Sequence, residues 1–353
     1  MKLIFVTRKI DKNDPLMGFV VGWITELAAN LETLYVICQE KGDALGLPAN
    51  VFVYSFGKEK GYGKIRQGLS LISLSLTLAN KADGFFVHQH PIYAILVSLA
   101  AKFFHCRLVF WYAHGHVDFK LKLATMLADR IVSSSPEGFR YQTRKARFIG
   151  QAIDTNKFKM KKSKIKMTNH NAKFKIISIG RISPVKNYEK LIKAAEILVK
   201  KKKIGNMVVQ IYGGIGLARH QNYLDSLIKL TENAGLTGII EFRGPVPHES
   251  VPELLAGADL FVNLSATGSM DKAVLEAMAA GCLVLTSNEA YGKILPSYAF
   301  IPVPQAEAIA AKIWEQAAAE SGATREHRLE LRRIVTEQHS IAGFIRKLLE
   351  EFH

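Results

Sequence analysis

The chain alternates short apolar runs with longer segments in which apolar residues recur every three or four positions. Short apolar runs bounded by turn residues are typical of buried strands, and the longer period is typical of helices packed on a sheet. In the first half we expect strands at Leu3–Val6, Thr33–Cys38, Val51–Tyr54, Gly84–His88, Arg107–Tyr112, Arg130–Ser133 and Arg147–Ile149. We expect helices at Val20–Asn30, Leu69–Asn80, Tyr93–Phe104 and Phe119–Leu127.

The second half repeats the alternation. Strands are expected at Lys175–Ile179, Asn206–Tyr212, Ile239–Arg243, Leu260–Leu264, Leu283–Ser287 and Ala299–Pro302, with helices at Tyr188–Lys200 and Ile341–Phe352. Alternating strands and helices predict parallel sheets covered on both faces. We therefore predict two α/β domains, 1–158 and 173–335, joined by a lysine-rich linker at 159–172 and followed by a C-terminal helical segment at 336–353.

One segment, Ala256–Gly281, combines a buried strand with a loop of small residues and a helix that opens at Asp271. The first N–H groups of a helix and the positive end of its dipole bind anions. Glu276 lies about one turn further along, where a carboxylate can accept hydrogen bonds from hydroxyl groups. An anion site beside a carboxylate that binds hydroxyls suits a nucleoside diphosphate with its ribose.

A second segment, Lys175–Asn187, suits the same ligand. A buried strand ends at Gly180, and Arg181 and Lys186 follow on the loop before a helix that Asn187 is expected to cap. Arginine offers a planar fork and lysine a point charge, and both suit phosphate oxygens. These two cations are the predicted diphosphate contacts.

The order of these motifs resembles the donor half of family 4 retaining glycosyltransferases (glycosyl transferases group 1). The resemblance covers about Phe174 to Ser287 and rests on GR…KN, Tyr212-Gly213-Gly214, IEFRGPV and ADLFVNLS…LEAMAAG. It implies the GT-B fold, with two facing Rossmann-like domains, a deep cleft between them, and a C-terminal helix at 336–353 that crosses back to the first domain. It also implies metal-independent transfer of a sugar from a UDP- or GDP-type donor to an acceptor hydroxyl, in glycan, lipopolysaccharide or glycolipid assembly.

The resemblance assigns roles to individual positions. Arg181 and Lys186 would stabilise the leaving diphosphate, and Glu276 would bind the ribose. Further donor contacts would come from Val246, Ser269, Met270, Asp271 and Lys272. In the first half, Gly18 matches a glycine loop that approaches the donor, although an ordinary turn is the alternative. His114 matches a histidine at the mouth of the active site, with His116 as the competing choice.

The chain departs from the family at Gly268, where many relatives carry a glutamate facing the donor sugar. Asp271 and Lys272 are the candidates to replace that glutamate, although Asp271 is equally suited to capping the helix. The departure keeps a second hypothesis open, namely a degenerate GT-B protein that binds nucleotide without turnover.

The formal net charge is +16, from 47 basic and 31 acidic residues. Such an excess suits nucleic acid, an anionic membrane surface or anionic substrates. No nucleic-acid module signature occurs, so we expect no nucleic-acid partner. The segment Tyr62–Leu78, basic and then apolar, either docks on lipid or forms a buried helix.

The remaining composition argues against cofactors and membrane spans. Cys38, Cys106 and Cys282 lie in apolar runs without metal-ligand spacing, and no Asp-x-Asp motif occurs. We expect reduced core thiols, no metal and no other cofactor. No apolar run is long enough for a membrane span. The expected location is the cytoplasm, with peripheral binding to the inner face of the membrane.

Overall fold

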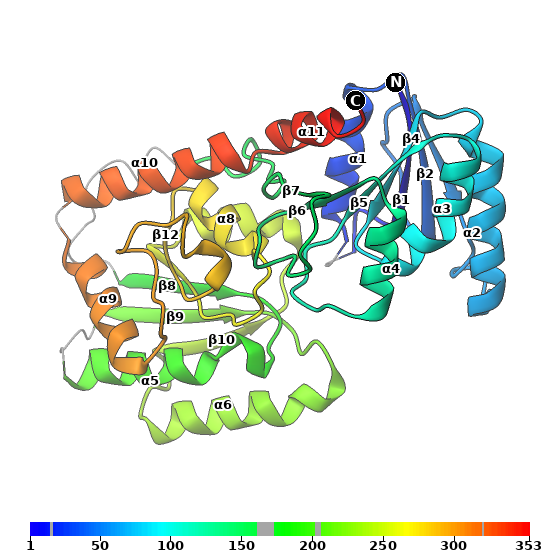
Figure 1. Ribbon diagram of the computed structural model, residues 1–353. Helices are drawn as coiled ribbons and strands as arrows, with labels where there is room; N and C mark the ends of the chain where they lie inside the picture. Colours follow the sequence, from blue (N-terminus) through cyan, green and yellow to red (C-terminus); the bar gives the residue numbers. More distant parts are fainter. Residues whose placement is uncertain (15–16, 161–172, 202–205, 320) are drawn as a thin grey trace. The chain divides into compact units, whose positions relative to one another are not determined.

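The computed structural model describes residues 1–14, 17–160, 173–201, 206–319 and 321–353. All but the first two residues of the predicted linker, 159–172, lie outside these ranges. The chain divides into two compact units (Figure 1). Unit 1 is Met1–Ala152 with Ser340–His353, and unit 2 is Ile153–His339.

Unit 1 contains a parallel sheet of seven strands in the order β3-β2-β1-β4-β5-β6-β7. The strands are β1 (Lys2–Ile10), β2 (Thr33–Lys41), β3 (Val51–Ser55), β4 (Gly84–His88), β5 (Arg107–Trp111), β6 (Arg130–Ser133) and β7 (Ala146–Phe148). The helices are α1 (Phe19–Ala29), α2 (Lys64–Ala79), α3 (Pro91–Phe103), α4 (Phe119–Leu127) and α11 (Ile341–Glu350). Every residue of β4 is buried, as expected for a central parallel strand.

Two apolar layers hold unit 1 together, one on each face of the sheet. Helices α2, α3 and α4 cover one face, and α1 and α11 cover the other (Figure 1). Phe344 of α11 is fully buried, with its ring centroid 4.7 Å from that of Trp23 and 5.1 Å from that of Trp111. The C-terminal helix is therefore part of the unit 1 core.

Unit 2 has a parallel sheet of five strands in the order β10-β9-β8-β11-β12. The strands are β8 (Phe174–Ile179), β9 (Met207–Tyr212), β10 (Ile240–Gly244), β11 (Leu260–Asn263) and β12 (Leu283–Thr286). The helices are α5 (Tyr188–Lys200), α6 (Gln221–Asn233), α7 (Val251–Ala256), α8 (Lys272–Ala279), α9 (Ala306–Ala318) and α10 (Ser321–Gln338). Helices α5, α6 and α9 lie on one side of this sheet, with α8 and α10 on the other (Figure 1).

The prediction of two α/β domains with parallel sheets is confirmed. The strand predicted at Ala299–Pro302 is wrong. Only a single bridge joins Phe300 to Thr286, and the Ile301 N–H bonds the Thr286 carbonyl. Pro302 has no N–H, so the ladder cannot continue. The three cysteines are buried free thiols, as predicted.

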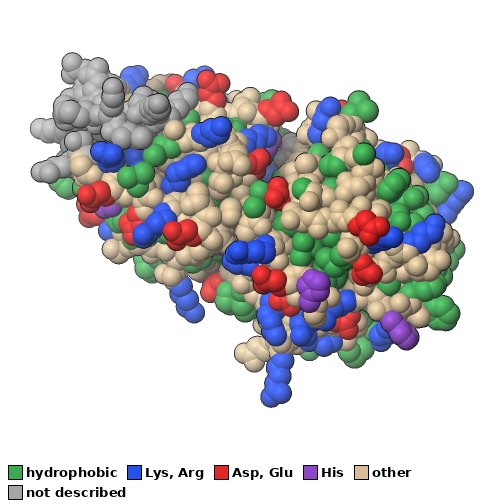
Figure 2. Space-filling model, turned by 90° about the horizontal axis from the view of Figure 1, so that it is seen from above, with side chains coloured by type: hydrophobic (Ala, Val, Ile, Leu, Met, Phe, Trp, Pro, Cys, Tyr) green, Lys and Arg blue, Asp and Glu red, His purple; other side chains and the backbone are tan. Residues whose placement is uncertain are grey.

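None of the helices in the described ranges combines the length and apolarity that a membrane span requires. On the face of the molecule in Figure 2, Lys and Arg side chains are interspersed with acidic ones. The charge excess is therefore not gathered into a single basic patch on that face.

Phe344→Ala should destabilise unit 1 by about 3–5 kcal/mol, because it removes a fully buried ring and leaves a cavity. Thermal unfolding followed by tryptophan fluorescence measures this, since Trp23 and Trp111 flank the ring. Arg346→Ala, at an exposed position on the same helix, is the control. Equal melting temperatures for the two variants would show that α11 does not stabilise unit 1.

Candidate functional site

The candidate site in unit 2 lies where two adjacent parallel strands end. Strands β8 and β11 pair in register, with Ile176 opposite Leu260 and Ile177 opposite Phe261. Parallel strands send their carboxyl-end loops to the same edge of the sheet, which is where open α/β sheets bind ligands. The two segments singled out from the sequence therefore meet in space.

Lys186 and Asp271 make the contact between these loops. The Lys186 ammonium donates to Asp271 Oδ2 at 2.8 Å, and the two side chains are only 14% and 22% exposed. Lys186 ends a short 3-10 helix, Pro184–Lys186, before α5, and Asp271 stands immediately before α8. The structure thus joins two residues that the sequence assigned to one ligand, through a contact that the sequence did not predict.

Asn263, the last residue of β11, orients Asp271. Its Nδ2 donates to Asp271 Oδ2 at 3.0 Å, while its Oδ1 accepts from the Ser265 N–H and the Thr286 hydroxyl, each at 3.3 Å. Asn263 is 3% exposed, and a buried amide with several partners holds a fixed orientation. Sequence reasoning missed this residue because an asparagine at a strand end usually indicates only a turn.

The capping contact predicted for Asn187 is wrong, and the capping alternative for Asp271 is not borne out. Asn187 and Asp271 do occupy N-cap positions, but neither side chain makes a capping hydrogen bond. The Asn187 amide donates to the Leu264 carbonyl at 2.7 Å, and Asp271 accepts from Lys186 and Asn263. Tertiary partners have replaced the local ones, so both side chains connect β8–α5 to β11–α8.

Gly268 adopts φ +68°, in the left-handed region that side-chain-bearing residues rarely occupy. The backbone at this position is therefore suited to glycine rather than to the glutamate of many relatives. The loop beyond it is held by Asn288, whose Nδ2 donates to the Ser269 carbonyl at 2.7 Å. Met270 is 3% exposed and packs in the core, which leaves its backbone as the part suited to a ligand contact.

The first turns of α8 carry Lys272 and Glu276. The Lys272 ammonium is buried, and burial holds its pKa well below the ordinary value, while the charge of Glu276 raises it in part. Glu276 is 8% exposed. A buried ammonium and a buried carboxylate thus lie at the start of one helix.

His248 is a further residue of this group, and the sequence did not predict it. Its Nε2 lies 3.1 Å from Glu276 Oε1, and its ring contacts the edge of Phe158. His248 begins a 3-10 turn just after Val246 and Pro247. Val246 is half-buried against the unit 2 core, so the loop after β10 lies close to Glu276. No sequence signal pairs a histidine with a glutamate 28 positions away.

Arg181 takes no part in the Lys186–Asp271 ion pair. Within the described residues it makes no ion pair or hydrogen bond, and it lines a hollow of about 380 Å³ with Ser183, Leu217 and His220. A Cβ built on Gly216 would come within 2.9 Å of the Arg181 side chain. The arginine is therefore packed along the β9–α6 loop with its charge unneutralised.

In unit 1, Gly18 occupies the N-cap position of α1. A Cβ there would come within 2.8 Å of the Asp14 carbonyl and 2.9 Å of the Lys12 carbonyl, so the turn itself requires glycine. Residues 15 and 16 of this loop lie outside the described ranges. The turn thus accounts for Gly18 without a ligand.

His114 is exposed just beyond β5 and contacts the Tyr112 ring edge-on. Burial and the charges of Arg8 and His114 lower the pKa of His90, so these three residues lie near one another at the carboxyl edge of the sheet. The competing choice is His116, whose backbone carbonyl accepts a hydrogen bond from the Tyr112 hydroxyl. His88 is a core residue, bonded to Thr7 and packed on Trp23.

Residues 159–328 match the family model of glycosyl transferases group 1. The D-inositol 3-phosphate glycosyltransferase of Streptomyces avermitilis is 32% identical over 114 residues, which are 31% of this chain and 24% of that relative. The human GDP-Man:Man(3)GlcNAc(2)-PP-Dol alpha-1,2-mannosyltransferase is 25% identical over 34% of this chain and 25% of its own length. The match thus spans about a quarter of the length of these relatives.

Solved structures resemble the whole chain. Anabaena Alr3699/HepE in complex with UDP superposes with a TM-score of 0.79 at 16% identity, over 99% of both chains. A glycosyltransferase from Rickettsia africae superposes with a TM-score of 0.76 at 17% identity, over 99% of this chain and 97% of the other. The chain has the GT-B fold, and the match of its second half to glycosyl transferases group 1 supports a GT-B glycosyltransferase.

Proposed function

We propose that this protein is a retaining, metal-independent glycosyltransferase that moves a sugar from a nucleoside diphosphate sugar to an acceptor hydroxyl. The observation that carries the proposal is the meeting of Lys186, Asp271 and the α8 residues Lys272 and Glu276 at the ends of β8 and β11. Two cations and a carboxylate on one sheet edge support our assignment of a diphosphate and a ribose to this site.

Lys186 and Arg181 are our candidates for the diphosphate contacts. Negative charge grows on the leaving phosphate as its bond to the sugar breaks, and preorganised cations stabilise that charge more than they stabilise the bound donor. Lys186 forms an ion pair with Asp271 at 2.8 Å. An incoming diphosphate therefore replaces part of an existing ion pair.

Lys272 would contribute a charge that depends on the ligand. Burial disfavours its charged form, and a diphosphate nearby would favour it. Binding of the anion would then draw a proton onto Lys272 and strengthen the site when it is needed. Ser269, Met270 and Asp271 would complete the donor contacts at the start of α8.

Glu276 is our candidate for the ribose hydroxyls. His248, 3.1 Å away, fixes one carboxylate oxygen and leaves the other for the ligand. The base of the nucleotide would rest on the loop after β10, against Val246. UDP and GDP are both candidates, because Alr3699/HepE is known with UDP and with UDP-glucose, and the human relative is a GDP-Man mannosyltransferase.

In the proposed reaction the bond from the anomeric carbon to the phosphate oxygen breaks, and a bond to the acceptor oxygen forms on the same face of the sugar. The leaving phosphate takes the acceptor proton, so no protein base is needed. In unit 1, we assign to His114 a bond to the sugar or the acceptor hydroxyl, and to Gly18 a close backbone approach to the donor. The acceptor would be a glycan, lipopolysaccharide or glycolipid precursor.

UDP or GDP should raise the melting temperature of the protein in buffer containing EDTA, because a ligand that binds only the folded state stabilises it. At a hundredfold excess over Kd the gain is about 2.7 kcal/mol. Differential scanning fluorimetry with and without Mg²⁺ measures this, with adenosine as a control that lacks the diphosphate.

A shift that requires the metal contradicts metal independence, and the absence of a shift with every nucleoside diphosphate contradicts the proposed donor site. A shift without turnover of any donor sugar would favour the degenerate binding protein.

Lys186→Ala should lower kcat/KM for sugar transfer or donor hydrolysis by roughly 100-fold or more, as expected for loss of a contact to a charged leaving group. Lys193→Ala, at an exposed position on the following helix α5, should leave kcat/KM unchanged. Asp271→Asn distinguishes two roles for the acid. If Asp271 only neutralises Lys186, the variant binds UDP at least as well as wild type. If Asp271 contacts the sugar, transfer falls while UDP binding persists. Wild-type activity in Lys186→Ala would remove Lys186 from the site.

Gly268→Ala should destabilise unit 2 by about 1–2 kcal/mol, because it places a Cβ in the left-handed region. Gly214→Ala is the matched control, since its added Cβ would meet nothing closer than 3.8 Å and its φ is ordinary. Calorimetry of both variants measures the difference. Equal stability would mean that the loop relaxes freely, and the backbone would then not explain the missing glutamate.

A further inference from the structure

The three helices on one face of the unit 1 sheet expose large apolar side chains to the outside. Their inner sides are satisfied, because Leu71, Val97 and Ala124 pack in the core layer beneath them. The outward residues are Ile65 and Leu69 of α2 (82% and 63% exposed), Leu99 and Phe103 of α3 (62% and 73%), and Phe119 and Met126 of α4 (76% and 66%). Single exposed apolar residues are ordinary, but a patch of large ones on adjacent helices indicates an interaction surface.

The same helices carry only positive charge. Their sequences, KIRQGLSLISLSLTLA, PIYAILVSLAAKF and FKLKLATML, contain no aspartate or glutamate. The cations are Lys64 and Arg66 on α2, Lys102 on α3, and Lys120 and Lys122 on α4, and all five are exposed. Helices α2 and α3 contact each other, as do α3 and α4, so the apolar and cationic residues share one continuous surface. We call this surface, made of the outer sides of α2, α3 and α4, the α2–α4 face.

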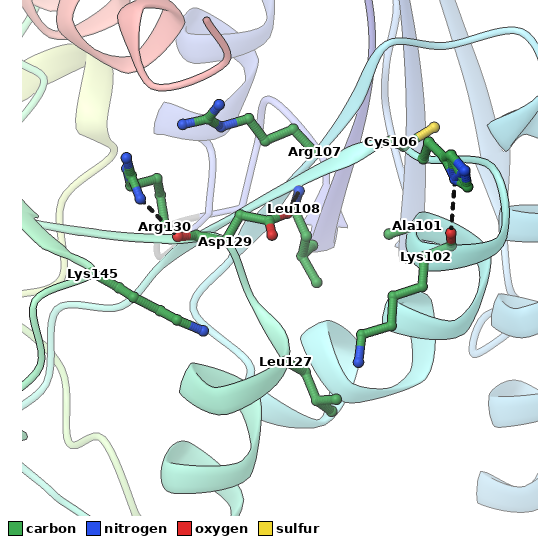
Figure 3. A pocket seen from close by; sticks show the side chains of 10 residues that line it. Ala101, Lys102, Cys106, Arg107, Leu108, Leu127, Asp129, Arg130 and Lys145 are labelled. Carbon is green, nitrogen blue, oxygen red and sulfur yellow. Dashed lines mark hydrogen bonds between the residues drawn. The ribbon is translucent and has the colours of Figure 1, made fainter.

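A basic hollow adjoins the α2–α4 face where α3 and α4 end. It has a volume of about 600 Å³ and is lined by Lys102, Arg107, Arg130 and Lys145 and by one acid, Asp129, which accepts from the Leu108 N–H (Figure 3). The Lys145 ammonium caps α4 by donating to three carbonyls, and Arg130 lies 3.3 Å from Glu351. The exposed Lys102 and its neighbour Phe103 therefore stand at the rim of a positive hollow.

We propose that the α2–α4 face docks the protein on an anionic lipid surface. Apolar side chains at the outer sides of helices enter the boundary between headgroups and acyl chains, and lysine and arginine reach back to the phosphates. On α2–α4, both kinds of residue alternate along the same helices, and none of the three helices contains an acid. The nearest acids, Asp118 and Asp129, flank α4. The hollow at the rim suits the phosphate of a headgroup.

Lipid fits this face better than other macromolecules. Nucleic-acid surfaces call for cations with few exposed aliphatic side chains. An acidic protein would be matched through pairs of complementary residues, whereas here exposed leucine, isoleucine, phenylalanine and methionine are spread over three helices. The segment Tyr62–Leu78 has features of both alternatives that its sequence left open. Helix α2 has a buried side at Leu71 and Leu78 and an exposed apolar side at Ile65 and Leu69.

The test is flotation of the full chain with vesicles of phosphatidylcholine, alone or mixed roughly three to one with phosphatidylglycerol. We expect binding to the mixed vesicles only, weakened by added salt. Lys120→Glu/Lys122→Glu should weaken that binding at least about tenfold, since each basic residue near an anionic surface contributes measurably. Lys193→Glu/Lys229→Glu makes the same charge change at exposed positions in unit 2 and should bind as wild type does.

A second pair of variants tests the apolar contribution. Phe103→Ser/Phe119→Ser should reduce vesicle binding, whereas Val303→Ser/Leu329→Ser, at exposed apolar positions of unit 2, should not. If the two charge-reversal variants lose vesicle binding equally, net charge alone explains the binding and the proposal is overturned. Equal binding to neutral and mixed vesicles, or no binding to either, would also overturn the proposal. A dimer in sedimentation that Phe103→Ser/Phe119→Ser converts to monomer would overturn it too, because the face would then be a protein interface. The nucleotide thermal shift is measured in parallel, so failure of the donor site is distinguishable from failure of docking.

Discussion

The ion pair between Lys186 and Asp271 is the contact on which the candidate site depends. The two residues are 85 positions apart, and each follows a different strand of the same sheet. Their partners are fixed independently, since Asn263 holds the carboxylate and Asn187 ties its own loop to the Leu264 carbonyl. The pair therefore brings the β8–α5 and β11–α8 loops to one defined separation before any ligand arrives.

An acid among these cations stabilises the cations themselves but would repel a bound anion. Without Asp271, Lys186, Lys272 and the positive end of α8 would repel one another in a partly dry environment. Asp271 relieves that repulsion and keeps Lys186 ordered. In the proposed donor complex, the diphosphate would meet the same carboxylate as an unfavourable neighbour, so the site would lose some donor affinity in return for preorganisation. Burial of the Lys272 ammonium limits the repulsion in a second way, because its charged form is already disfavoured.

The sequence was sufficient where local pattern determines structure. Arg130–Ser133 and Tyr188–Lys200 have the predicted bounds, because short apolar runs and a strong helical period specify them. The start of α2 was misplaced, at Leu69 instead of Lys64, because its first turn is polar and carries no apolar period. Contacts across the sheet were harder to anticipate. The contacts His248–Glu276 and Asn263–Asp271 depend on how two strand ends are juxtaposed. Local capping rules mispredicted Asn187, because a tertiary partner competed for its side chain.

The proposed lipid face and the carboxyl edge of unit 1 are consequences of the same crossovers. Each strand–helix–strand connection sends a loop to the carboxyl edge and lays its helix on the sheet. Helix α3 begins beside His90 at that edge and carries Phe103 at its other end. At 1.5 Å per residue, its 13 residues span roughly 20 Å. If α2, α3 and α4 lie flat on a lipid surface, the loops that carry His90 and His114 are held at the level of the headgroups. An acceptor anchored in that surface then reaches the carboxyl edge of unit 1 without leaving the membrane.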